Sequence, residues 1–127
     1  MTPRAAQLVE GADQALTTAQ RGLETRDLEA AAERACVAML RLAKACLDVD
    51  GLSPGPANAV CTEYGQHFGT GGRMYSAYFR WLLDAADLRK AASGEFAARI
   101  DYDAAATVVE RAEIFRDAVT RLLQRSH

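Results

Sequence analysis

The chain has 127 residues, of which 50% are hydrophobic and 25% charged, and its formal net charge is −2. This length predicts a single domain, residues 1–127, with enough chain to bury one core. The weakly acidic balance gives no overall basic field that would favour nucleic acid or an anionic membrane surface. The apolar runs are too short to cross a bilayer, so the sequence predicts no membrane-spanning segment.

The cysteines of the chain are Cys36, Cys46 and Cys61. Their number is odd, they form no CxxC pair, and no secretory signal pattern opens the sequence. Thiols used in this way are typical of proteins that stay reduced in the cytoplasm. We therefore expect a cytoplasmic protein in which Cys36 and Cys46 serve as small apolar core residues.

The first predicted helix covers residues 3–25, with Thr2 as its N-cap and a proline at its first position. A second helix begins at Asp27, whose carboxylate can cap it, and ends at Asp50 and Gly51. Alanine and leucine recur at three-to-four-residue spacing along both segments. Each helix is therefore expected to turn one apolar face to the core.

Prolines and glycines at 53–56 predict a loop, which a short helix over 57–68 follows. The glycines at 69–72 break that helix. A fourth helix is expected over about 73–92, with Tyr75 among the residues that widen its apolar face.

Residues 96–102 are expected to be irregular or a short helix, and the last helix starts near Asp101 or Asp103, either of which can cap it. Its apolar stripe is the most regular in the chain and consists of Ala105, Val108, Ala112, Phe115, Val119 and Leu122. No alternating strand pattern competes with these helices, and their connections are short. The sequence therefore predicts an all-α fold, an up-and-down bundle of four to five helices.

Several polar clusters have both a functional and a structural interpretation. His67 shares a helix face with Glu63, which could offer two metal ligands, but the favoured role is a polar-face or capping histidine. Arg73 lies among aromatic residues, a mix that can stack RNA bases but is more typical of a core covered by arginine side chains. The glycine loop could hold an anion, yet it lacks the features of a P-loop. No metal and no cofactor are predicted.

Three stretches of the sequence carry a family resemblance. Residues 33–40 read Glu-Arg-Ala-Cys-Val-Ala-Met-Leu, residues 64–72 read Tyr-Gly-Gln-His-Phe-Gly-Thr-Gly-Gly, and residues 89–94 read Arg-Lys-Ala-Ala-Ser-Gly. They resemble the corresponding phrases of HEPN domains, in particular the small stand-alone bacterial and archaeal ones. The stretch 64–72 is the most specific of the three, and the resemblance extends over roughly 28–123.

The resemblance implies a helical bundle that often forms a homodimer. Members bind nucleotides, cleave RNA without a metal, or pair with a small nucleotidyltransferase in a two-component, toxin–antitoxin-like system. The active ones place a histidine shortly after an arginine that corresponds to Arg89. In this chain that histidine would fall at Gly94, Glu95 or Phe96, so the family's reactive side chain is missing.

The sequence therefore predicts a catalytically degenerate HEPN-like protein that binds a nucleotide, RNA or a partner protein. Arg89, Lys90 and Arg34 are the candidate anion- or nucleotide-binding residues, and His67 and Arg73 are weaker candidates. Without the resemblance, Arg89 and Lys90 fit a helix C-terminus, where the macrodipole favours cations. Two alternatives stay open: an active metal-independent RNase that uses Arg89, and an unrelated structural or assembly bundle.

Overall fold

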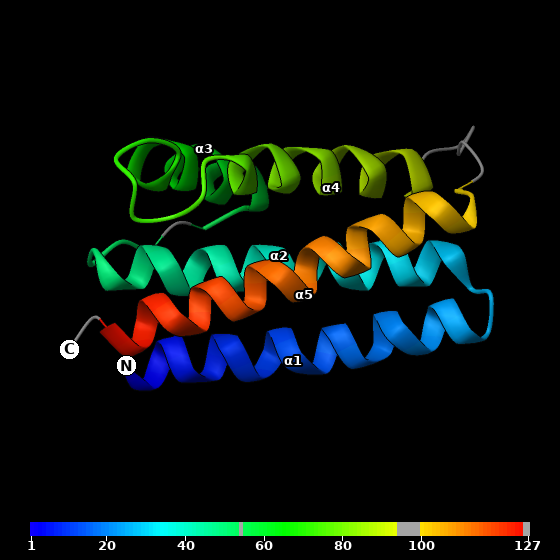
Figure 1. The fold of residues 1–127 in the computed structure, drawn as a ribbon, viewed down its shortest axis with the longest axis horizontal. Helices are drawn as coiled ribbons and strands as arrows, with labels where there is room; N and C mark the ends of the chain where they lie inside the picture. The colour runs from blue at the N-terminus through cyan, green and yellow to red at the C-terminus, as the bar shows by residue number, and fades with distance from the viewer. Residues whose placement is uncertain (54, 94–99, 126–127) are drawn as a thin grey trace.

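The computed structural model describes residues 1–53, 55–93 and 100–125, which form five α-helices and no strand. The helices are α1 (Pro3–Glu24), α2 (Leu28–Val49), α3 (Ala57–Phe68), α4 (Ala77–Ser93) and α5 (Tyr102–Arg125). Figure 1 shows α1, α2, α4 and α5 running up and down along the long axis, with the short α3 beside the start of α4. The predicted all-α bundle is confirmed. None of these helices is both long and apolar enough to span a membrane.

Local signals set the ends of the first two helices as predicted. The Thr2 hydroxyl accepts a hydrogen bond from the Ala5 N–H at 3.0 Å, and the Asp27 carboxylate accepts one from the Ala30 N–H at 3.3 Å. Each cap satisfies a backbone donor that has no partner within its helix. At the end of α2, Gly51 adopts a φ of 76°, which suits a residue without a side chain.

The central helix of the bundle is α2, which packs against all four other helices. Half of its buried residues are alanine, and the larger Met39, Leu42 and Leu47 are fully enclosed. Small side chains let neighbouring backbones approach closely. At Gly22 of α1 an added Cβ would lie only 3.0 Å from the Ala31 backbone nitrogen of α2.

An aromatic cluster joins α3, α4 and α5. The Phe115 ring of α5 lies 5.6 Å from Tyr64 of α3 and 5.3 Å from Tyr78 of α4, measured between ring centroids. Tyr64 also stacks on Phe68 at 5.3 Å. These contacts anchor α3 and α4, which carry the candidate site, to the rest of the bundle.

The predicted start of the fourth helix is wrong, because α4 begins at Ala77 and not near residue 73. Gly71 and Gly72 have φ angles of 94° and 81°, and the loop continues past them. The Arg73 side chain donates hydrogen bonds to the Asp50 carboxylate and to the His67 carbonyl, which ties this segment to the ends of α2 and α3. Tyr75 therefore does not widen a buried helix face: it is 63% exposed.

The last helix resolves the choice between two predicted caps. The Asp101 carboxylate accepts a hydrogen bond from the Ala104 N–H at 2.8 Å, so Asp101 is the N-cap of α5. All six residues of its predicted apolar stripe are buried. Most of the segment expected to be irregular or a short helix lies outside the described residues; Ile100, at its end, is buried in the core.

Candidate functional site

Two grooves flank α4, one on each side. The α2–α4 groove, of about 430 Å³, is lined by residues of α2, α3 and α4, and the α4–α5 groove, of about 350 Å³, by residues of α4 and α5. The residues of α4 that line the α2–α4 groove are Leu83, Ala86, Asp87, Arg89, Lys90 and Ser93. Those that line the α4–α5 groove are Trp81, Asp84, Ala85 and Leu88. Residues three and four apart share a helix face, so one helix serves both grooves.

The α2–α4 groove combines an apolar floor with polar edges. Leu40 of α2 and Leu83 of α4 contribute to the floor. Asn58 and Thr62, four residues apart on α3, add an amide and a hydroxyl on one face. Groups of this kind can accept or donate hydrogen bonds to a polar ligand.

Both predicted cations, Arg89 and Lys90, line the α2–α4 groove. Arg89 is partly buried and Lys90 is exposed. Within the described part of the chain neither of them forms an ion pair, whereas Arg34, Arg73, Arg111 and Arg116 all do. Asp87 also lines the groove, but two cations outnumber this one carboxylate, so the lining keeps a net positive charge that suits an anion.

Two thiols, Cys36 of α2 and Cys61 of α3, share the groove with these cations. Burial raises the pKa of Cys36 to about 11, although the nearby Arg89 guanidinium opposes the shift. Burial likewise raises the pKa of Cys61, and Lys90 opposes it. Both thiols are therefore protonated at neutral pH and leave the positive charge of the groove intact.

Sequence reasoning missed the role of Cys36 and Cys61 in this groove. They lie on different helices, and no spacing rule pairs residues so far apart in the chain. The apolar pattern correctly indicated that Cys36 and Cys46 are buried. Only the packing of α2 against α3 brings Cys36 and Cys61 to one surface.

The third candidate cation, Arg34, is not among the residues that line the groove. Its guanidinium donates a hydrogen bond to the adjacent Glu33 carboxylate at 2.9 Å. Its charge is therefore already partly compensated on the surface of α2.

His67 and Arg73 belong to a separate cluster around Asp50. Arg73 donates two hydrogen bonds to the Asp50 carboxylate, at 3.1 and 2.9 Å, and a third to the His67 carbonyl at 3.1 Å. The His67 Nδ1 lies 3.7 Å from Asp50, and the Arg73 guanidinium lies 4.2 Å above the Phe68 ring. These contacts tie the end of α2 to the loop after α3, which is a structural role.

The pKa of Asp50 is lowered, because the hydrogen bonds from Arg73 stabilise its charged form. In the described residues no group of three or more histidine, cysteine or acidic side chains is arranged to hold a metal ion. The Asp50 cluster therefore offers an ion-pair network and not a ligand set.

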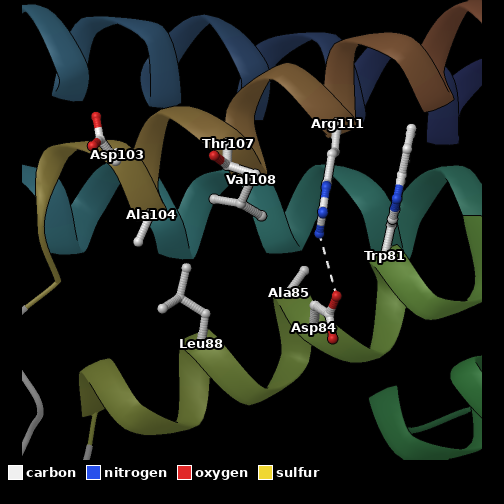
Figure 2. Close-up of a pocket in the computed structure, with 9 residues that line it drawn as sticks. All are labelled: Trp81, Asp84, Ala85, Leu88, Asp103, Ala104, Thr107, Val108 and Arg111. Atoms are coloured by element: carbon white, nitrogen blue, oxygen red, sulfur yellow. Dashed lines mark hydrogen bonds and ion pairs between the residues drawn. The ribbon is translucent and has the colours of Figure 1, made fainter.

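The α4–α5 groove differs in its charge. Figure 2 shows Arg111 reaching from α5 towards Asp84 of α4, beside the flat face of Trp81. The Arg111–Asp84 distance is 3.2 Å, and the guanidinium lies 5.3 Å from the centre of the Trp81 rings. Asp103 adds a second carboxylate to the lining. Since its one cation is paired, this groove suits an anion less well than the α2–α4 groove.

Comparison with known proteins finds no relative of this chain: it matches no family model, and no curated protein matches its sequence. The functional argument therefore depends on the geometry of the α2–α4 groove and on the resemblance of short motifs.

Proposed function

We propose that this chain is a HEPN-like, catalytically degenerate helical protein whose α2–α4 groove binds the phosphate of a nucleotide or of RNA. The observation that carries the proposal is the presence of Arg89 and Lys90 in one groove, without ion-pair partners among the described residues. Cations on a concave surface give phosphate a charge-assisted site.

The remaining lining of the groove supports a small ligand. Asn58 offers an uncharged amide beside the cations, and Leu40 and Leu83 offer apolar contact. The Thr62 and Ser93 hydroxyls donate to the Asn58 and Lys90 carbonyls, so they can only accept a hydrogen bond from a ligand. A volume of about 430 Å³ falls within the range typical of small-molecule sites. A mononucleotide, or the end of a single strand, fits this combination better than a duplex.

The groove also argues for binding rather than for cleavage. RNA cleavage through the ribose hydroxyl needs a general base or acid near neutral pKa. The described lining contains no histidine, its two thiols are held in the protonated state by burial, and its acid–base groups are otherwise one carboxylate, Asp87, and the two cations. Positions 94–96, where the family histidine would fall, lie outside the described residues.

The direct test is nucleotide binding by isothermal titration calorimetry, with ATP, AMP and inorganic phosphate as ligands. Arg89→Gln and Lys90→Gln should each weaken binding roughly 10- to 100-fold, since a hydrogen bond to a charged group contributes about 1.5–3 kcal/mol. Arg121→Gln removes an exposed cation of α5 and serves as the matched control. Equal affinity in all variants would reject the groove as the binding site.

The RNase alternative predicts a different result with the same Arg89 variant. Incubation with single-stranded RNA in a chelator should leave the RNA intact if the chain only binds. Metal-independent cleavage that Arg89→Ala abolishes would replace the binding proposal with an enzymatic one.

The resemblance also supports a homodimer and a small nucleotidyltransferase partner, which form part of the proposal. Light scattering after size-exclusion chromatography tests the first, with twice the 13.7 kDa chain mass expected. Co-purification from the native host tests the second. A monomer that captures no such enzyme would favour the structural or assembly alternative.

A further inference from the structure

The α2–α4 groove contains one charged group that phosphate binding does not explain. Asp87 of α4 lines the groove together with Arg89 and Lys90, and these three are the charged residues of its described lining. The Asp87 side chain is exposed, and none of the ion pairs among the described residues includes it. A carboxylate weakens the binding of phosphate beside it, so its place here points to a hydrogen-bond donor elsewhere on the ligand.

Three kinds of side chain follow one another along the face of α4 that forms the groove. Leu83, Asp87 and Lys90 are four and three residues apart, a spacing that places them on one side of the helix. At the helical rise, successive members are separated by about 6 Å and about 4.5 Å along the axis. This face therefore presents an apolar group, a hydrogen-bond acceptor and a cation, in that order.

The wall that α2 contributes agrees with this order. Figure 1 shows α2 and α4 running in opposite directions. Leu40 comes after Cys36 in α2, so it lies nearer to the start of α4, on the Leu83 side of the groove. One end of the groove is therefore apolar on both helices, and the other end carries Arg89 and Lys90. A ligand with an apolar end, hydroxyl groups in its middle and an anionic end fits this arrangement.

We propose that the α2–α4 groove binds a nucleoside 5′-phosphate with a free ribose diol, and that Asp87 selects the ribose. The base lies against Leu40 and Leu83, and the phosphate binds Arg89 and Lys90. The 2′- and 3′-hydroxyls donate hydrogen bonds to the two oxygens of the Asp87 carboxylate. The inference rests on the proposed function and deepens it, since it names the ligand and the residue that discriminates it.

Asp87 separates this ligand from other compounds that carry phosphate. Inorganic phosphate experiences the repulsion of the carboxylate and gains no hydroxyl contact with it. A deoxyribonucleotide offers one donor fewer, and an internal nucleotide of RNA has no free diol. The diol with a phosphate on the 5′ side occurs both in a free mononucleotide and at the 3′ end of RNA, and the groove volume of about 430 Å³ suits one such unit.

The experiment is isothermal titration calorimetry of the full chain with AMP, 2′-deoxy-AMP and inorganic phosphate. The wild type should bind AMP about 10-fold more tightly than 2′-deoxy-AMP, the lower end for a hydrogen bond to a charged group, because water can replace the lost hydroxyl at an exposed carboxylate. This comparison needs no variant. A short RNA with a free 3′ end separates the two sources of the diol: binding at least as tight as that of AMP identifies the RNA end, and weaker binding identifies the mononucleotide.

Asp87→Ala should change the affinities for AMP and for inorganic phosphate in opposite directions. AMP loses its hydrogen bonds to the carboxylate and should bind more weakly, whereas inorganic phosphate loses a repulsive charge and should bind more tightly. The preference for AMP over 2′-deoxy-AMP should disappear. A purely structural role of Asp87 would instead weaken the binding of all three ligands together.

Glu110→Ala is the matched control for the change in net charge, because Glu110 is an exposed carboxylate of α5 that does not line the groove. It should leave the three affinities unchanged. Equal affinity of the wild type for AMP and 2′-deoxy-AMP would overturn the inference and leave the phosphate site in place. A ribose preference that persists in Asp87→Ala would assign the selection to another residue. Absence of all binding would reject the proposed function, and this inference with it.

Discussion

Asp50 shows how a single side chain can fix the path of a loop. It is 23 residues from Arg73 in the sequence, yet it receives two hydrogen bonds from that guanidinium. The same carboxylate lies beside His67. Through these contacts the end of α2 holds the segment between α3 and α4. The helix α4 begins after this segment, at Ala77.

Replacement of Asp50 tests this role through its pH dependence. The pKa of Asp50 is lowered in the folded chain, so its stabilising effect is present above its ordinary pKa and is lost as the pH falls through the lowered value. Asp50→Asn should reduce the free energy of unfolding by up to about 1 kcal/mol at pH 7. The difference from wild type should shrink at pH 3.

Urea denaturation at both pH values measures the effect. Asp117→Asn, which alters a carboxylate whose side chain is 63% exposed, is the control and should change little. A difference between wild type and Asp50→Asn that stays constant from pH 7 to pH 3 would contradict an electrostatic role for Asp50.

At the scale of the helices, capping residues set where a helix begins or ends, and the spacing of apolar residues sets which of its faces is buried. The boundaries of α1, α2 and α3 agree closely with those expected from Thr2, Asp27 and the glycines that follow. The helix α4 is the exception. Its predicted first turn has helix-compatible residues, but the contacts of Arg73 with Asp50 and with the His67 carbonyl oppose helix formation there.

The N-terminus of α5 offers a comparison of two neighbouring carboxylates. Asp101→Ala removes the hydrogen bond to the Ala104 N–H and should lower the free energy of unfolding by about 1 kcal/mol. Asp103→Ala removes only a favourable charge in the first turn, which is worth about 0.3 kcal/mol at an exposed position. Thermal and urea unfolding of the two variants should therefore rank Asp101→Ala as the less stable. The opposite ranking would identify Asp103 as the functional cap.

For the molecule as a whole, one aromatic cluster connects three of the five helices. Phe115 is fully buried and contacts Tyr64 and Tyr78 on two other helices. The grooves on both sides of α4 depend on this packing, because it sets the position of α4 relative to α2 and α5. A loss of this contact should therefore destabilise the entire bundle and not one helix alone.

Phe115→Ala should lower the free energy of unfolding by about 3–5 kcal/mol. Ile114→Ala, at the adjacent position that is 40% exposed, is the control and should cost far less. Helix content by circular dichroism and fluorescence of the single tryptophan, Trp81, should follow the same denaturation curve. Separate transitions for the two signals would show that α4 unfolds independently.

The sequence predicted the all-α class, the five helical segments and most of their ends from local patterns. It could do so because helix periodicity and N-caps depend on residues only three or four positions apart. It also identified Arg89 and Lys90 as a pair, since they are adjacent in the chain.

The packing of the helices settled which residues meet. It brought Cys36, Cys61, Arg89 and Lys90 to one groove, left Arg34 outside its lining, and assigned Arg73 to Asp50. The physical reason is that these encounters depend on how alanine-rich helix faces pack. Such faces are nearly uniform in size and polarity, so their sequence does not specify a unique partner.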